Sequence, residues 1–333
     1  MAKISRKLDF ILLTTVLSQV VPCGIASLCI LSSATPAFSQ TSPITAAPDG
    51  TGTLIAPNGQ RFDITGGKTS NDGANLFHSF QQFGLSQDQI ANFISNPNIK
   101  NIFGRVVGGD ASLINGLIQV TGGSSNLFLV NPAGIIFGAN AQLNVPAAFT
   151  ATTANGIGFG TNWFKAVGVN DYAALTGTPS AFAFTGTQSG GIVNFGNLTV
   201  QPGQSLSFLG GAVLNLGELR ASAGEITIAA IPGKSLVKVS QPGHLLSIEV
   251  QPIASPFPVD NPSLPAAAIP QLLTGIGKAQ ASSIQVNPDG TLQLTSGQPP
   301  ISIAQGTAIA SGKINVAGTT GGSIQVLGQN VGV

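Results

Sequence analysis

The sequence predicts an all-β fold, a parallel β-helix in which short strands coil and each coil stacks on the previous one. Residues 190–200 read GGIVNFGNLTV and residues 211–221 read GAVLNLGELRA, so the two segments match at a shift of 21. Three short apolar stretches, separated by Gly and Asn, fit into each shift, and repeats of about this length are typical of solenoids. Alternation such as Ser205-Leu206-Ser207-Phe208 turns every second side chain inward. A β-sandwich is the alternative, but its hairpins would not repeat at this spacing.

Matching positions in successive coils are expected to stack, because a coil buries its apolar face only against its neighbours. Leu198 and Leu219 occupy one such pair of positions, and Asn194 and Asn215 another. Two interpretations of the asparagines remain open. They form a ladder inside the β-helix, or they are turn residues.

The first 39 residues predict a secretory signal that signal peptidase removes. Basic residues precede an uncharged apolar run over residues 10–21, and Ala37-Phe38-Ser39 offers small residues at the cleavage site. A retained membrane anchor and a lipoprotein are the alternatives. The residues before Cys23 and Cys29 are not the small ones that lipoprotein processing requires.

Removal of this signal leaves a chain without cysteine and nearly without net charge. Both cysteines, three of the 13 Lys+Arg and one of the 12 Asp+Glu lie in the signal, so the net charge becomes about −1. Such a chain has no disulfide, and it lacks the basic stripe that nucleic-acid binding requires. With 43% hydrophobic and only 8% charged residues, it is too apolar for disorder.

The strand pattern runs from residue 51 to residue 250 with one expected interruption, a short helix. Ser86-Gln87-Asp88-Gln89 has the form of a capping box that begins a helix. Ile90, Phe93 and Ile94 would then face the core.

The remainder of the chain is expected to leave the coil and return to it. Residues 251–281 are rich in proline, which precludes central strands, and predict an excursion or linker. Residues 282–333 predict further coils, starting with Ser283-Ile284-Gln285-Val286. No polar cap follows the last coil, although a solenoid normally needs one.

A tight turn is predicted at Asn131-Pro132-Ala133-Gly134-Ile135, between two apolar runs. Pro132 presets φ for its turn position, and Gly134 can adopt a positive φ. This stretch resembles the Asn-Pro-Asn-Gly-Ile signature of the secretion domain of two-partner-secreted exoproteins, the filamentous haemagglutinin N-terminal domain family. Ala133 replaces the second Asn of that signature.

Other segments resemble motifs of the same family, in the same order, over about residues 44–250. They are residues 75–83, Asn96-Pro97-Asn98-Ile99, residues 115–120 and, in a form similar to cyanobacterial members, residues 156–160 and 236–240. The resemblance implies a right-handed β-helix over residues 40–250. It also implies that an Omp85-type outer-membrane transporter recognises the chain in the periplasm and passes it to the cell surface or the extracellular space.

The resemblance assigns transporter recognition to two groups of residues. The first is Asn131, Pro132, Gly134 and Ile135, and the second is Asn96, Pro97, Asn98 and Ile99. The first turn is expected to combine a structural role with recognition. For the second, a plain helix stop is the alternative. Neither a surface glycan nor a protein ligand can be named, and an adhesin that follows the domain is one option.

Catalysis, a cofactor and a metal are not expected. Gly66-Gly67-Lys68-Thr69 imitates the end of a phosphate-binding loop, but Phe62 stands where that motif needs Gly. His78, in an apolar run, predicts a hydrogen-bonded core histidine, and Trp163 a cap on the core rather than a sugar platform. Glu218 and Arg220 share a strand face and predict a solvated edge. A carbohydrate-active β-helix and a structural surface module remain the alternative functions.

Overall fold

The computed structural model describes residues 44–186, 189–238, 249–252, 283–286, 292–295 and 301–333. The predicted signal lies outside the described residues, as does the proline-rich segment from residue 253 onward. Nearly all regular structure in the described part is β-strand, and the exception is the short 3-10 turn η1 (Tyr172–Ala174). Within these residues no helix has the length and apolar character to span a membrane.

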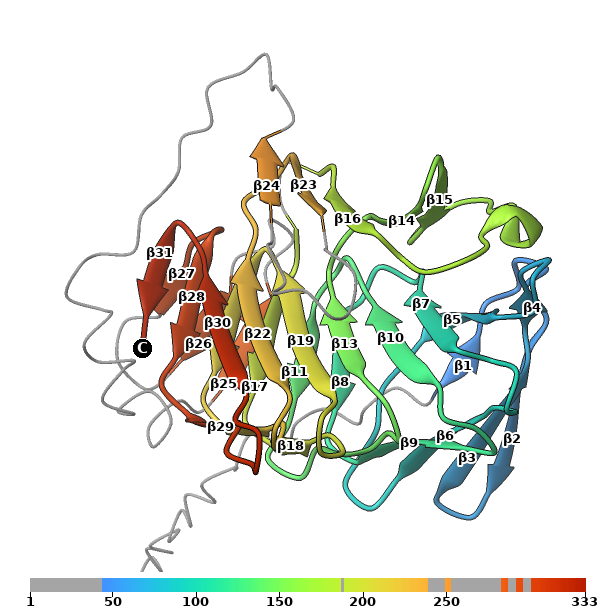
Figure 1. The fold of residues 1–333 in the computed structure, drawn as a ribbon, viewed down its shortest axis with the longest axis horizontal. Coiled ribbons are helices and arrows are strands. Elements are labelled where there is room, and N and C mark those ends of the chain that lie inside the picture. The colour runs from blue at the N-terminus through green and yellow to red at the C-terminus, as the bar shows by residue number, and fades with distance from the viewer. Residues whose placement is uncertain (1–43, 187–188, 239–248, 253–282, 287–291, 296–300) are drawn as a thin grey trace, which may run out of the picture. The chain divides into compact units, whose positions relative to one another are not determined.

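Three faces of parallel strands form the body of the fold, as predicted (Figure 1). Face 1 contains β5 (Asn75–Gln82), β7 (Asn101–Val106), β10 (Asn126–Val130), β13 (Phe149–Thr152), β19 (Ser205–Gly210), β22 (Glu225–Ala230) and β30 (Ser323–Leu327). Face 2 contains β8 (Ser112–Ile114), β11 (Ile135–Phe137), β17 (Gly191–Asn194), β20 (Ala212–Asn215), β28 (Thr307–Ala310) and β31 (Asn330–Gly332). Face 3 contains β6 (Ile90–Ile94), β9 (Leu117–Thr121) and β12 (Gln142–Asn144), followed by β18 (Asn197–Thr199), β21 (Glu218–Arg220) and β29 (Lys313–Asn315).

Each coil passes through the faces in the order 1, 2, 3, and equivalent residues stack in the predicted columns. Leu198 pairs with Leu219, and Leu219 pairs in turn with Ile314. Ile192 pairs with Val213 in the same way. These side chains belong to one continuous apolar core inside the β-helix. The expected parallel β-helix is therefore confirmed.

Asparagine ladders run inside this fold. Asn194 Nδ2 donates to Asn215 Oδ1 at 2.8 Å, and Asn194 Oδ1 also accepts a hydrogen bond from the backbone of Gly196 at 3.0 Å. Both asparagines are fully buried. Both interpretations of these asparagines are therefore correct. One side-chain amide has enough donors and acceptors to form the ladder bond and the turn bond at once. A second ladder, which the sequence analysis missed, joins Asn75, Asn101 and Asn126.

The N-terminal end of the stack is closed by antiparallel strands. β1 (Thr45–Ala46) and β4 (Lys68–Thr69) pair with β5, and the hairpin of β2 (Thr53–Asn58) and β3 (Arg61–Gly66) adds β3 beside β6. These strands occupy edges that would otherwise be open to other chains.

The prediction of a helix after Ser86 is wrong, because the residues that follow form a strand. Gln89 Oε1 does accept from the Ser86 backbone N–H at 2.8 Å, which is half of a capping box. Asp88, however, has a φ of 66°, which no right-handed helix permits. Ile90–Ile94 instead forms β6 between β3 and β9, and Phe93 turns inward with strand periodicity. Ile94 points outward, contrary to the prediction.

A second antiparallel sheet, here called the cover sheet, packs on the outside of face 1. It contains β14 (Gly156–Phe159), β15 (Asn162–Lys165), β16 (Ala181–Phe184), β23 (Ser235–Lys238) and β24 (Glu249–Pro252). Phe77, Phe103 and Phe128 point outward from face 1 and stack, with ring centroids 5.2 and 4.6 Å apart. Side chains of the cover sheet, such as Phe159 and Phe182, complete a second apolar core with them.

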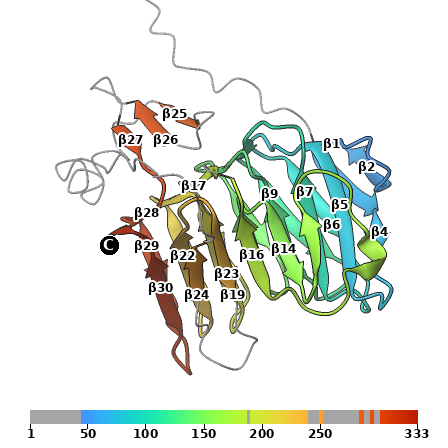
Figure 2. The same cartoon turned by 90° about the horizontal axis from the view of Figure 1, so that it is seen from above.

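The return to the coil also differs from the prediction. β25 (Ser283–Val286), β26 (Leu292–Thr295) and β27 (Ile301–Ile303) form their own antiparallel sheet (Figure 2). The parallel stack resumes only at β28, which pairs with β20. Apolar alternation is common to both arrangements, so it could not distinguish a coil strand from a hairpin strand.

Candidate functional site

The first predicted motif, the Asn131 turn (residues 131–135), lies at the corner between faces 1 and 2. Its backbone closes a tight turn, because Gly134 N–H donates to the Asn131 carbonyl at 3.0 Å. Gly134 has a φ of 126°, so the expected positive φ is confirmed. Ile135 then starts β11 with its side chain fully buried.

The Asn131 side chain is an internal structural element. Its Nδ2 donates to the Asp110 carbonyl at 2.9 Å and to Ser112 Oγ at 3.0 Å, and its Oδ1 accepts from Ala133 N–H at 3.0 Å. Only 1% of the residue is exposed. Gly190 of the following coil donates to the Pro132 carbonyl at 2.9 Å. The turn thus connects the coil before it with the coil after it.

The second motif, the Asn96 turn (residues 96–99), lies at the corner between faces 3 and 1 and is exposed. Asn98 N–H donates to Asn96 Oδ1 at 2.9 Å, and Ile99 N–H donates to the Asn96 carbonyl at 3.1 Å. Asn96, Pro97 and Asn98 are exposed, whereas Ile99 is anchored in the core at 4% exposure. Their neighbours Asp72 and Lys100 complete a shallow depression beside the turn.

The two motifs therefore differ in what they offer to a partner. They lie at different corners of the β-helix, and the structure does not bring them together. The Asn96 turn presents the exposed amide side chains of Asn96 and Asn98, the first of which also accepts a hydrogen bond within the turn. The Asn131 turn presents mainly Pro132 and Ala133, which are half-buried. The sequence could not distinguish the buried amide of Asn131 from the exposed amide of Asn96, because both motifs begin with Asn-Pro.

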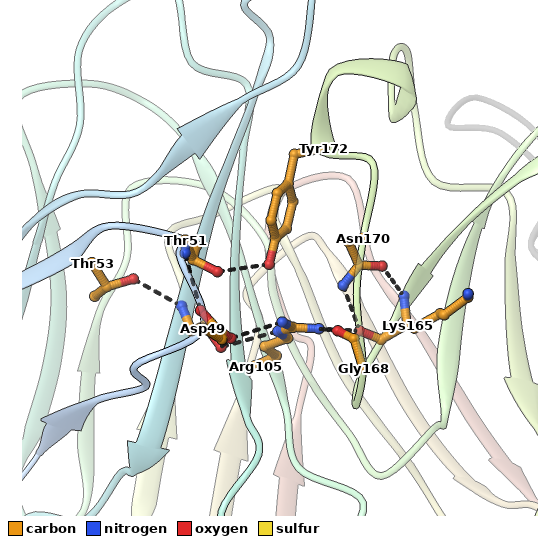
Figure 3. A network of polar contacts seen from close by, with 9 residues as sticks. Asp49, Thr51, Thr53, Arg105, Lys165, Gly168, Asn170 and Tyr172 are labelled. Carbon is orange, nitrogen blue, oxygen red and sulfur yellow. Dashed lines mark hydrogen bonds and ion pairs between the residues drawn. The ribbon is translucent and has the colours of Figure 1, made fainter.

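A polar network that the sequence analysis missed lies around Arg105 (Figure 3). Arg105 is 3% exposed, and its Nη2 pairs with Asp49 Oδ2 at 2.8 Å. Its Nη1 donates to the carbonyls of Lys165 and Gly168 at 2.9 and 2.8 Å. Its Nε donates to Ser79 Oγ at 3.0 Å, and that hydroxyl donates to Asp49. Three separate parts of the chain meet at one guanidinium.

Asp49 also links the network to η1. Its Oδ1 accepts from Thr51 N–H at 3.0 Å, and Thr51 Oγ1 lies 2.8 Å from the Tyr172 hydroxyl. Partial burial alone would raise the pKa of Asp49, but hydrogen bonds from Ser79, Thr51 and Arg105 lower it to about 2. The carboxylate is therefore charged at any physiological pH.

His78 lies in the core, as predicted, but it is not hydrogen-bonded. Neither ring nitrogen has a partner among the described residues, and the ring packs near Phe80 and Phe93, with centroids 6.2 and 5.8 Å away. Burial lowers the pKa of His78 to about 4, so the ring is neutral near pH 7. Its inward position follows from strand alternation, since Phe77 and Ser79 point outward.

The remaining candidate residues lie on the surface or pair locally. Trp163 is 37% exposed and lies across Gly158 on the cover sheet. Glu218 pairs with Lys313 of the next coil at 3.3 Å. No three His, Cys, Asp or Glu side chains in the described part of the chain are grouped as metal ligands would be.

Comparison with protein families identifies this β-helix. The family model of the TPS secretion domain matches residues 39–256. The chain belongs to the TPS secretion domain family. TPS domains are the secretion domains of haemagglutinin-like exoproteins, which two-partner systems deliver to the cell surface or the extracellular space. Members of this family generally serve secretion rather than catalysis.

Solved secretion domains are similar to this TPS domain. The HMW1 secretion domain from Haemophilus influenzae is 22% identical, with a TM-score of 0.44, over 64% of this chain and 49% of that chain. The filamentous hemagglutinin secretion domain is 16% identical, with a TM-score of 0.46, over 68% of this chain and 73% of that chain. The chain thus spans about half the length of the HMW1 structure. A search of curated proteins gave no significant match.

Proposed function

We propose that this chain is the secreted partner of a two-partner system. An Omp85-type outer-membrane transporter recognises the chain in the periplasm and delivers it to the cell surface or the extracellular space. The TPS secretion domain match over residues 39–256 carries this proposal. Folding outside the cell supplies a direction for transport, because each new coil buries apolar side chains against the previous one. Burial contributes about 1.5–3 kcal/mol for each large aliphatic side chain before the entropy of ordering is subtracted.

Within this function, the Asn96 turn is the better candidate for direct recognition. Its amide side chains are exposed and its backbone is fixed by Ile99 beneath it. The Asn131 turn acts mainly through folding, since its amide is consumed by contacts within the protein. Pro132 remains partly accessible and is its candidate contact residue.

The experiment measures secretion of the full chain in cells with and without the transporter. Secretion should require the transporter, and equal extracellular amounts in both strains would contradict the proposal. The variant Asn96→Ala/Asn98→Ala should then reduce secretion while lowering the free energy of unfolding of the purified protein by no more than about 0.5–1 kcal/mol, because both side chains are exposed. Asn144→Ala, at another exposed asparagine on face 3, is the matched control and should be secreted like the parent.

A further inference from the structure

The last coil of the stack, formed by β29, β30 and β31, is paired on one side only (Figure 1). β30 pairs with β22, β31 with β28 and β29 with β21. Within the described residues, none of the three has a second strand partner. The outer edge of such a strand presents backbone N–H and C=O groups, which are a template for pairing with another chain.

Core side chains of this last coil reach solvent. Ile324 pairs with the fully buried Ile226, and Val331 pairs with the fully buried Ala308, so both side chains point into the interior of the β-helix. Ile324 is nevertheless 46% exposed, and Val331 is 45% exposed. The same coil adds three partly buried apolar side chains against that core, Ile314, Val316 and Val326. The apolar core of the described protein is thus open at this end.

The opposite end of the stack is closed. The β2–β3 hairpin and β1 occupy it, and Ile64 on β3 is fully buried. A second copy of the chain therefore meets an open core only at the end that carries β30. Contact between two identical ends is isologous and closes as a dimer, whereas contact between unlike ends would propagate into a fibre.

The charge pattern of the open end favours a second copy as the occupant. Residues 314–333 contain no Lys, Arg, Asp, Glu or Pro, and Lys313 before them pairs with Glu218 at 3.3 Å. Charged side chains and prolines are the usual devices that keep strand edges from pairing. Two copies of this end can therefore meet without like-charge repulsion, and the surface offers no charge that would select a charged partner.

We infer that the open ends of two copies of this chain pack against one another, with β30 of one copy antiparallel to β30 of the other. A two-fold axis through the middle of β30 passes near Gln325, so this residue faces its own counterpart. The contact buries Ile324 and Val331 of both copies. Because the surface consists of a completed coil, the dimer forms only after folding, which in the proposed function occurs outside the cell.

Analytical ultracentrifugation of the purified protein over a range of concentrations tests the dimer. The parent should be dimeric at micromolar concentration and should dissociate on dilution. Ile324→Asp/Val331→Asp should weaken dimerisation about a hundredfold or more, because the two-fold axis brings the new carboxylates of both copies into one apolar contact. Leu54→Asp is the matched control, since Leu54 is 63% exposed on β2 at the closed end, and it should dimerise like the parent.

A cysteine cross-link tests the pairing of the two β30 strands. In a Cys23→Ser/Cys29→Ser background, which has no other cysteine, Gln325→Cys should form a disulfide between the copies under mild oxidation. Opposed residues of antiparallel strands have Cα atoms about 4.5–5.5 Å apart, a separation that a disulfide spans. Thr199→Cys, on the exposed side of β18, is the control and should not form a cross-link.

Circular dichroism and the urea midpoint establish that each variant is folded, and the cross-link decides if Ile324→Asp/Val331→Asp does not fold. A parent that is monomeric at every concentration would overturn the inference, as would a dimer that this variant leaves intact. Assemblies of more than two copies would contradict the closed contact. If Gln325→Cys forms no cross-link, or Thr199→Cys forms one equally well, β30 is not the pairing strand. None of these measurements depends on secretion, so the proposed function is tested separately.

Discussion

Two buried ionisable residues on neighbouring strands of face 1, Arg105 and His78, have opposite surroundings, one polar and one apolar. The Arg105 guanidinium is surrounded by acceptors, because Asp49, Ser79 and two backbone carbonyls replace its lost water. His78 has aromatic neighbours and no hydrogen-bond partner among the described residues, so it can only be buried in its neutral form. Strand alternation places them on different sides of the sheet, and this decides their surroundings.

His78 should make the stability of the fold depend on pH. The unfolded chain binds a proton at this residue below its ordinary pKa of 6.5, and the folded chain does so only below about 4. Between these values the unfolded state binds more protons, so stability should fall as the pH is lowered from 6.5 to 4, by on the order of 3 kcal/mol. Urea unfolding across this pH range measures the loss.

The variant His78→Phe is the control for that measurement, since it keeps an aromatic ring and cannot titrate. Its stability should change much less over the same interval. Asp49 causes a separate loss of stability at more acid pH, because folding lowers its pKa from 3.8 to about 2. The stabilisation by its carboxylate disappears as the pH falls through that range. Parallel pH profiles of parent and variant would contradict the assignment to His78.

Asn131 and Asn96 should differ in stability although their motifs look alike. Asn131→Ala removes the partner of the Asp110 carbonyl, of Ser112 Oγ and of Ala133 N–H, and should cost about 1–3 kcal/mol. Asn96→Ala, at an exposed turn, should cost about 0.5 kcal/mol. Urea denaturation of both proteins measures the difference. Equal midpoints would show that the buried amide contributes no net stability.

At the scale of elements, the cover sheet explains why several strands of face 1 are apolar on both sides. In β10, Leu127 and Leu129 face the inside of the β-helix, while Phe128 and Val130 face the cover sheet. A strand that is buried on both sides loses the alternation that marks a half-exposed strand. The sequence therefore showed that these strands exist but not what covers them.

Phe103→Ala should destabilise the contact between face 1 and the cover sheet. The ring stacks between Phe77 and Phe128 and contacts Phe159 edge-on, with centroids 5.4 Å apart. Its loss should cost about 3–5 kcal/mol and speed up proteolysis within the cover sheet. Leu54→Ala, on the exposed side of β2, is the control and should change stability by less than about 0.5 kcal/mol. Unchanged proteolysis in Phe103→Ala would mean that the two sheets do not depend on one another.

On the scale of the whole molecule, the coils form a stack in which each one is stabilised by its neighbours. Ladders of backbone hydrogen bonds, apolar columns and asparagine ladders all run along the stack from coil to coil. Stability in such a fold is a sum over neighbours, so damage in one coil spreads first to the coils beside it.

Leu219→Asp tests this nearest-neighbour behaviour. Leu219 is fully buried between Leu198 and Ile314, so an aspartate there would place an unpaired charge in the column. Hydrogen exchange should show lost protection in β17–β22 and retained protection in β5–β10. A uniform loss of protection over all strands would indicate a single cooperative unit instead, and full protection would contradict the predicted column.

The sequence by itself determined the coiled architecture, because the shift of 21 between residues 190–200 and 211–221 repeats both the apolar positions and the turn residues. It also marked the Asn96 and Asn131 turns, since Pro and Gly restrict φ locally. The tertiary structure alone decided that Ile90–Ile94 is a strand, because β3 and β9 supply its hydrogen bonds from both sides. It likewise decided that the Asn131 amide is buried and that Arg105 joins Asp49 to the carbonyls of Lys165 and Gly168. Contacts between residues far apart in the chain create both features, and local sequence carries no signal for such contacts.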